Sequence, residues 1–134
     1  MTETQNTVVT ALPTELKKML KILDSKKAKD ITLLEISAQT VIADYFLICE
    51  GTSNTHIRSL AGELEYQLSL DGRAPSHMEG YEDGNWILVD FGSIVVHLFN
   101  RETRNYYHLE KLWQEATAID VAAVLAEETK EEEQ

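Results

Sequence analysis

The 134-residue sequence has little cysteine: Cys49 is the only one, which excludes an internal disulfide. Cys49 lies at the end of the apolar run 45–49, where a thiol most often packs as a small buried side chain. Reactive cysteines need a partly exposed, electropositive setting, which this run does not offer. A single domain of this length buries roughly two thirds of its unfolded surface, so neither a disulfide nor a metal is needed to hold it together. We therefore expect Cys49 to have a structural role.

Long apolar runs are also missing. No stretch approaches the roughly 20 residues that a membrane-spanning helix needs. Residues 1–11 carry neither the basic cluster nor the apolar core of a targeting signal. These absences predict a soluble, cytoplasmic protein with no membrane contact.

Positive charge is scarce, because 12 lysines and arginines stand against 23 acidic residues, which gives a net charge of −11. Such a charge is repelled by bare phosphate backbone, so we expect no direct nucleic-acid specificity. A basic protein is the natural electrostatic partner. Half of the basic residues lie between Lys17 and Lys29, and we interpret them as a solvated helix face, with a phosphate-contacting patch as the alternative. The acidic tail, 127–134, is expected to be solvated or frayed.

Regular apolar patterns predict most of the secondary structure. Leu16, Met19, Leu20 and Leu23 follow the helical spacing i, i+3, i+4, i+7, and we expect Thr14 to cap their helix. The predicted elements are a helix from Thr14, strands at Asp30–Ile36 and Asp44–Glu50, a helix between a Ser53 or Asn54 cap and Asp71-Gly72, strands at Trp86–Asp90 and Ile94–Phe99, and helices at Glu102–Gln114 and Val121–Glu128.

This order, α-β-β-α-β-β-α, predicts an α/β fold in which one mixed sheet packs against helices. The near-continuous apolar character of 44–50 indicates a strand buried on both faces. Residues 73–84 are expected to form a loop, with a possible short strand near Ala74, and Gly92 to turn the last hairpin. We divide the chain into a loose end at 1–13, a domain at 14–114 and an extension with the acidic tail at 115–134.

The turn Gly51-Thr52-Ser53-Asn54 precedes a helix, where free backbone N–H groups favour an anion. It lacks the glycine spacing of a phosphate-binding loop, and a plain turn with a helix cap explains it better. Metal-dependent nucleotidyl transfer would need paired acids that share one face. Glu63 and Glu65 lie inside the predicted helix, about 200° apart around its axis, and do not converge. A nucleotide-binding enzyme with nucleotidyltransferase-type activity is therefore the alternative hypothesis rather than the favoured one.

Other candidate chemistry is weak. Asp90-Phe91-Gly92 spells a kinase tripeptide but has none of the accompanying kinase motifs, so a hairpin turn is the better account. The histidines, His56, His77, His97 and His108, fall on different elements without metal-ligand spacing. No serine, threonine or cysteine has a readable catalytic partner. We therefore predict no catalytic residues, no metal and no cofactor.

Aromatic residues are concentrated between Trp86 and Trp113, and Tyr106 and Tyr107 share one predicted helix with Trp113. At least one ridge of that helix must pack on the sheet, so each ring is either core or interface. Tryptophan and tyrosine are the residues that most often dominate protein interfaces. The segment predicts a surface that binds a macromolecule.

Several short motifs in this order resemble one family: Ala43-Asp44-Tyr45-Phe46, Gly51-Thr52-Ser53 followed by His56, Gly80 ahead of the Trp86 strand, Val89-Asp90-Phe91-Gly92, Val95-Val96-His97, and Tyr107 with Leu109-Glu110-Lys111-Leu112-Trp113. Together they resemble the ribosomal silencing factor family, also called Iojap, from about Leu16 through Trp113. The resemblance implies a nucleotidyltransferase-like fold without the transferase's metal-binding acids. It implies a non-enzymatic repressor that binds the large ribosomal subunit through the ribosomal protein numbered fourteen, at the face that meets the small subunit. Occupation of that face blocks subunit joining when nutrients are limiting.

Members of this family are commonly homodimers, so a homodimer is also expected. For the partner-binding surface we predict Trp86, Tyr107 and Glu110 as contacts, with His97 and Asp90 as further candidates. The lysine-rich helix and the acidic tail receive no role from the resemblance.

Overall fold

The computed structural model describes the backbone of residues 12–133 and the side chains of residues 12–127. The predicted loose end at 1–13 therefore lies almost wholly outside the described residues. The elements are, in order, α2 (Thr14–Ser25), β1 (Lys29–Glu35), β2 (Tyr45–Glu50), α3 (Asn54–Leu70), β3 (His77–Glu79), β4 (Trp86–Asp90), β5 (Ile94–Phe99), α4 (Arg101–Tyr107), α5 (Leu109–Leu112), β6 (Thr117–Ile119) and α6 (Val121–Glu133).

A six-stranded mixed sheet forms the centre of the fold, with strand order β3-β4-β5-β2-β1-β6. Only β2 and β5 run parallel, and they are the two central strands. The predicted mixed sheet with helices packed against it is confirmed. The central position of β2 explains its apolar sequence, because side chains on both of its faces are buried.

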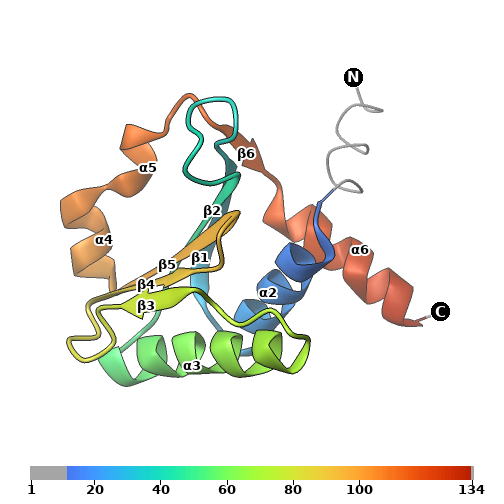
Figure 1. Ribbon diagram of the computed structural model, residues 1–134, viewed down its shortest axis with the longest axis horizontal. Coiled ribbons are helices and arrows are strands. Elements are labelled where there is room, and N and C mark those ends of the chain that lie inside the picture. The colour runs from blue at the N-terminus through green and yellow to red at the C-terminus, as the bar shows by residue number, and fades with distance from the viewer. Residues whose placement is uncertain (1–11, 134) are drawn as a thin grey trace.

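Helices cover the two faces of the sheet unequally (Figure 1). On one face α2 and α3 pack side by side with α6 beside them, over a core that includes Leu16, Leu47, Leu64 and Val96. On the other face the short helices α4 and α5 bring Leu109 and Trp113 onto a smaller core around Ile48 and Phe99. The second face is the less covered one and carries the candidate site.

The two long predicted helices are confirmed with a correction to one cap. Ser53 caps α3, since its Oγ accepts a hydrogen bond of 3.0 Å from the His56 backbone N–H. The predicted cap at Thr14 is wrong: Pro13 is the residue before α2, and Thr14 is the first helical residue without a side-chain cap. The Pro13 carbonyl accepts the first helical hydrogen bonds, from the N–H groups of Leu16 and Lys17.

The predicted single helix at 102–114 is wrong. His108 adopts a left-handed conformation with φ 50°, which ends α4 and turns the chain into α5. The apolar spacing continues through this point, so periodicity does not reveal the break. Its consequence is that Tyr107 and Glu110 lie on two differently directed helices.

The sequence-based prediction misplaces one short strand and lacks another. β3 begins at His77, three residues after the predicted position near Ala74, and β6 lies where no strand was expected. Each is an edge strand that pairs along one side only, β3 with β4 and β6 with β1. Each spans only three residues, and neither has an alternating apolar pattern. β6 and α6 thus pack the described part of residues 115–134 on the same sheet as the rest of the chain. α6 also continues to Glu133, beyond the predicted end at Glu128, so the backbone of the acidic tail is helical that far.

Cys49 is fully buried in β2, as predicted. Burial raises the pKa of its thiol to about 12, with the nearby Arg104 charge only partly opposing this effect. We expect Ellman's reagent not to label Cys49 in the native protein at about pH 8 and to label it fully in concentrated guanidinium. A Ser69→Cys variant, with an added thiol on the exposed face of α3, is the control that must react in the native state. Labelling of native Cys49 at the rate of that control would contradict its inert role.

Candidate docking surface

An aromatic cluster lies on the sheet face that carries α4 and α5. The Trp86 ring on β4 is 4.9 Å from Phe99 on β5 and 4.8 Å from Tyr107 on α4, measured between ring centroids. Trp86 is half-buried, Phe99 is fully buried, and Tyr107 is 52 % exposed. The cluster therefore runs from the core to the surface, with Tyr107 as its outermost ring.

A second group of rings packs on the core side of this cluster. Phe46 on β2 lies 4.7 Å from the His97 ring and 5.3 Å from the Trp113 ring, both in edge-to-face arrangements. Phe46 is buried and Trp113 half-buried. The aromatic segment that the sequence predicted as core or interface is thus divided: Phe99 is core, and Tyr107 is surface.

His97 holds Trp86 in place. Its Nδ1 accepts a hydrogen bond of 3.2 Å from the indole Nε1–H, so the proton of the neutral imidazole is assigned to Nε2. His97 is only 4 % exposed and therefore lies beneath the surface, where it cannot contact a partner directly. We accordingly propose His97 as the residue that orients Trp86, and not as a direct contact. Sequence alternation alone does not reveal this, because β5 is covered on both faces.

Burial lowers the pKa of His97 to about 4, since the charged imidazolium loses its hydration among aromatic rings. An unfolded histidine titrates near 6.5, so between pH 6.5 and 4 the unfolded chain binds more protons than the native one. The contribution of His97 to stability is complete above pH 6.5 and is lost as the pH falls toward 4. From pH 7.5 to 5 we expect a loss of about 2 kcal/mol in the free energy of unfolding.

The measurement is urea unfolding at several pH values for the wild type and for His97→Phe. The variant keeps a ring in the cluster but does not titrate, so its unfolding free energy should fall less over this pH range. Parallel pH profiles for the two proteins would contradict the assigned role of His97. The exposed histidine variant His77→Phe is the control that should keep the wild-type slope.

A buried ionic network lies below α4. Arg104 is 7 % exposed, and its guanidinium donates to Glu50 Oε2 at 3.2 Å, to the Asp30 carbonyl at 2.8 Å and to Thr32 Oγ1 at 3.0 Å. Its Nε–H donates to Glu110 Oε1 at 2.7 Å. Arg104 therefore connects α4 to β1, β2 and α5, and fixes the corner at His108.

Glu110 belongs to this network as well as to the surface. Its desolvation would raise the pKa of the carboxyl, but hydrogen bonds from the backbone and from Arg104, with the charge of that guanidinium, lower it overall. Its Oε1 is occupied by Arg104, and its Oε2 is buried with no hydrogen-bond partner among the described residues. Because Oε2 is buried and Oε1 is paired with Arg104, the carboxylate presents no unpaired exposed oxygen to a partner, and the contact at Glu110 stays a prediction.

Exposed apolar side chains lie on α4, on α5 and in the loop between β1 and β2. Tyr106 is 80 % exposed and Leu112 76 % exposed, on α4 and α5. Val41 and Ile42, in the loop between β1 and β2, are 101 % and 68 % exposed. This loop lies beside the chain after α5 (Figure 1), where Gln39 Nε2 donates to the Glu115 carbonyl at 3.4 Å. We call Tyr106, Tyr107, Leu112 and the Trp86 ring beside Tyr107 the docking surface. Val41 and Ile42 precede Tyr45 and therefore lie toward the other end of the sheet, because Tyr45 pairs with Ile94 whereas Trp86 pairs with Phe99.

The exposed apolar residues include three that sequence reasoning missed. Val41 and Ile42 form an apolar pair inside a polar segment without strand or helix periodicity, and that mismatch is the signal that would have found them. Leu112 was hidden in the pattern of the predicted single helix, and only the break at His108 turns it outward.

Asp90 does not join the docking surface. It lies at the opposite end of β4 from Trp86, about 13 Å away at 3.3 Å per residue. Its Oδ1 accepts a hydrogen bond of 2.8 Å from the Gly92 N–H, and its other oxygen faces His77 at 3.7 Å. Gly92 has φ 90°, so Asp90 stabilises the hairpin turn, as the turn interpretation of Asp90-Phe91-Gly92 predicted. We do not propose Asp90 as a contact.

The turn before α3 has a structural explanation. A Cβ on Gly51 would lie 2.6 Å from Cγ1 of Ile57, so a side chain does not fit there. Glu63 and Glu65 are both on α3, as predicted, and Glu63 accepts a hydrogen bond of 2.8 Å from Gln67. Among residues 12–133 no three histidine, cysteine or acidic side chains are grouped to hold a metal, and no helix there is long and apolar enough to cross a bilayer.

Comparison with known proteins identifies the chain. The family model described as "Ribosomal silencing factor during starvation" matches residues 9–134. The chain belongs to the ribosomal silencing factor family. It is 42 % identical over 98 residues to the ribosomal silencing factor of Bacillus subtilis, which covers 73 % of this chain and 83 % of that protein. It is 38 % identical over 104 residues to the silencing factor of Halalkalibacterium halodurans, covering 78 % and 89 %.

Solved structures of silencing-factor relatives share the fold. A crystal structure of a Chromobacterium violaceum protein superposes with a TM-score of 0.73 at 34 % identity, covering 75 % of this chain and 83 % of that one. A Bacillus halodurans structure gives 0.70 at 35 % identity, covering 81 % and 99 %. A mouse relative, named mitochondrial assembly of ribosomal large subunit protein 1, is 35 % identical over 86 % of this chain, which spans 52 % of its length. The general role in translational silencing follows from family membership.

Proposed function

We propose that this silencing factor binds the large ribosomal subunit through the ribosomal protein numbered fourteen, and that it does so with the docking surface. Once bound, it occupies the face that meets the small subunit and represses translation when nutrients are limiting. The observation that carries this proposal is the docking surface itself: exposed aromatic and aliphatic side chains backed by a buried network. Such a surface supplies affinity and position, which are all that a steric blocker needs.

Charge supports a protein partner. The chain carries −11, so a basic ribosomal protein meets a field of the right sign, which raises the rate of encounter. Affinity is then set by the packing of the exposed rings, because rim charges contribute little once the complex has formed. We place this activity in the cytoplasm, where ribosomal subunits join.

Subunit joining tests the proposal directly. Purified subunits are mixed at a magnesium concentration that joins them, with increasing amounts of the protein, and separated on a density gradient. We expect the joined peak to fall and the protein to sediment with the large subunit alone. Full joining at saturating protein would rule the proposed function out.

A homodimer through the docking surface accounts for its exposure in the single chain. Two copies would cover Tyr106, Tyr107 and Leu112, and would compete with the ribosome for the same side chains. Light scattering across a concentration series gives the mass, and titration of large subunits should convert dimer into bound monomer. A dimer that persists on the subunit would place the dimer contact elsewhere.

A further inference from the structure

A lysine-rich turn follows α2 at the end of the sheet. Lys26, Lys27 and Lys29 line a surface hollow together with Thr52 and His56, which stand before and at the start of α3. Among the side chains of residues 12–127 no ion pair involves these three lysines, which are partly or fully exposed. We call residues 26–29 the lysine turn. It is a local concentration of positive charge on an otherwise acidic protein.

His56 links the two segments that line the hollow. Its Nδ1 accepts a hydrogen bond of 2.9 Å from the Thr52 backbone N–H, so Nε2 is assigned the proton and donates to the Lys26 carbonyl at 2.8 Å. This histidine therefore fixes the lysine turn against the start of α3. Both ring nitrogens of His56 are engaged in these hydrogen bonds. The lysine ammonium groups take no part in them and face the solvent.

Lys27 occupies a position that usually belongs to glycine. The Ala28 N–H donates to the Leu23 carbonyl at 2.9 Å and the Lys27 N–H to the Asp24 carbonyl at 3.0 Å, which is the Schellman pattern at a helix end. Lys27 is the left-handed residue of this motif, with φ 63°. A side chain with a Cβ is disfavoured there, and only glycine adopts this conformation freely. Lysine at this position therefore departs from the local backbone preference.

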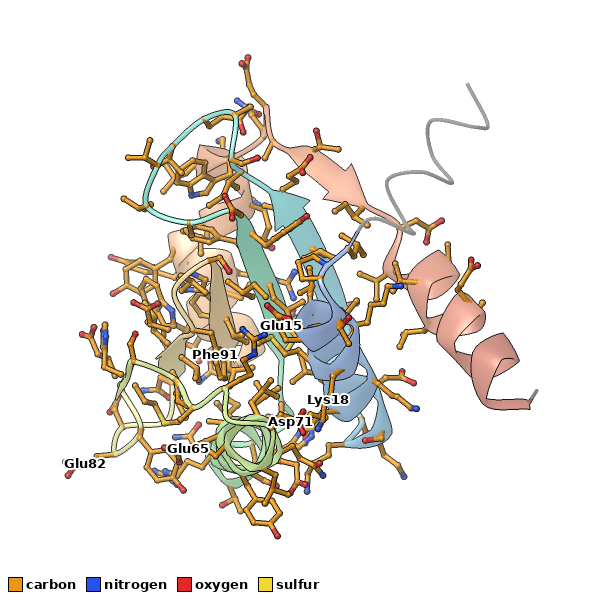
Figure 2. All side chains as sticks on the ribbon, turned by 45° about the vertical axis from the view of Figure 1, so that its right-hand side comes forward. Glu15, Lys18, Glu65, Asp71, Glu82 and Phe91 are labelled. Atoms are coloured by element: carbon orange, nitrogen blue, oxygen red, sulfur yellow. The ribbon has the colours of Figure 1, made fainter. Side chains whose placement is uncertain are left out.

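The positive charge continues along the junction of α2 and α3. A second hollow there is lined by Lys17, Lys18, Lys21 and Gln67. Lys18 Nζ lies 2.5 Å from the Asp71 carboxylate at the end of α3, and Figure 2 shows the two side chains side by side. Lys26 lies instead beside the start of α3, so the helices run antiparallel and the lysines follow their junction. From Lys18 to Lys26 the strip spans about 12 Å at 1.5 Å per residue.

The lysine turn is connected to α4, the helix that carries Tyr106 and Tyr107 of the docking surface. Asp30, the next residue, accepts a hydrogen bond from Arg104 on its carbonyl at 2.8 Å, and its carboxylate lies 3.4 Å from Arg101 of α4. When a partner is bound to the docking surface, the molecules around that partner would therefore lie close to the lysine turn.

We propose that the lysine turn binds the sugar-phosphate backbone of RNA beside the docked silencing factor. This inference rests on the proposed function for its location. A row of ammonium groups on flexible stems suits phosphates, which need charge but little directional bonding. The overall charge of −11 does not prevent the contact, because charges more than about 8 Å away are largely screened at physiological salt. The contact adds affinity without sequence preference, in agreement with the expected lack of nucleic-acid specificity.

The first test uses a fluorescein-labelled single-stranded RNA of about 20 nucleotides and measures anisotropy at several salt concentrations. We expect Lys27→Gly/Lys29→Gln to weaken RNA binding by at least about 10-fold at low salt. We also expect it to reduce the slope of log K against log salt by about 1.4, at 0.7 per phosphate contact. The matched control, Arg73→Gln/Lys111→Gln, also removes two positive charges, but from exposed positions elsewhere. It should keep the wild-type affinity and the wild-type slope of log K against log salt.

Lys27→Gly separates binding from folding. Because glycine fits the left-handed position, this single change should raise Tm by roughly 2–4 °C while it weakens RNA binding. A loss of binding by a more stable protein is not a folding defect. Equal RNA binding by the lysine-turn double variant and its control, or no RNA binding by the wild type at low salt, would overturn the proposal. Phosphatidylserine vesicles are the second probe, and lysine-dependent binding to vesicles but not to RNA would assign the lysine turn to a membrane surface instead.

Co-sedimentation with large subunits distinguishes a failure of the proposed function from a failure of the RNA contact. If the wild type does not co-sediment at all, the proposed function fails and the RNA measurement still decides the lysine turn in isolation. If the wild type co-sediments and Lys27→Gly/Lys29→Gln does so equally at every salt concentration, the proposed function stands and the RNA contact on the ribosome is refuted. We expect the double variant to leave the subunit at lower salt than the wild type.

Discussion

Replacing Arg104 by methionine is expected to lower the free energy of unfolding by about 3–5 kcal/mol. Arg104 and Glu50 are both buried, at 7 % and 6 % exposure, so the variant leaves the Glu50 carboxylate without its closest counter-charge in a site that water does not reach. It also removes the donors to Thr32 and to the Asp30 carbonyl. Urea unfolding followed by circular dichroism gives the change, and an unaltered slope would show that the native compactness is kept.

Arg101→Met is the matched control. Arg101 approaches the same Glu50 carboxylate at 3.4 Å, but its side chain is 72 % exposed, so solvent screens the pair. We expect a loss of at most about 1 kcal/mol from this variant. Adding Glu50→Leu to Arg104→Met should recover part of the stability, because the unpaired carboxylate is gone. Equal losses from Arg104→Met and Arg101→Met would mean that burial of the network contributes nothing.

Tyr107→Ala/Leu112→Ala is expected to weaken binding to the large subunit by at least about 100-fold. Interface residues that bind a partner in this way contribute about 2 kcal/mol or more each, and these two lie at the exposed edge of the aromatic cluster. Stability should change much less than binding, since Tyr107 is 52 % and Leu112 is 76 % exposed. Binding is measured by co-sedimentation with large subunits over a range of protein concentrations.

The chain offers a matched control on the opposite side of the sheet. Tyr66 and Leu70, both on α3, are 61 % and 66 % exposed, so Tyr66→Ala/Leu70→Ala removes the same side chains with similar exposure. This control should bind as the wild type does. If both double variants lost affinity equally, the docking surface would not be the contact. If neither variant lost affinity, Tyr107 and Leu112 would not belong to the ribosome-binding site.

The two predictions are linked by the geometry around α5. Glu110 joins Arg104 within the network, and Leu112 projects from the same short helix into the solvent. A helix of four residues has little stability of its own, so its position depends on such contacts. We therefore expect Arg104→Met to weaken ribosome binding as well, although Arg104 itself is buried.

Much of the fold follows from the sequence because its causes are local. The apolar spacing in α2 and α3, the continuous apolar run of β2 and the hairpin between β4 and β5 each depend on neighbouring residues. The Ser53 cap and the burial of Cys49 have the same kind of cause, so both were predicted. Residue patterns also led to the family, because the spacing of several short motifs is preserved along the chain.

The docking surface depends on the tertiary structure instead. Alternation along β5 does not say that His97 is covered, since that depends on Trp86 and Phe46, which come from other strands. The sequence by itself determined α2 and α3, the central strands and the family. Only the folded chain decided which aromatic rings face the solvent, which carboxylates pair with Arg104, and that Asp90 stands apart from Trp86. The physical reason is that burial is set by elements distant in sequence, and no local pattern carries that information.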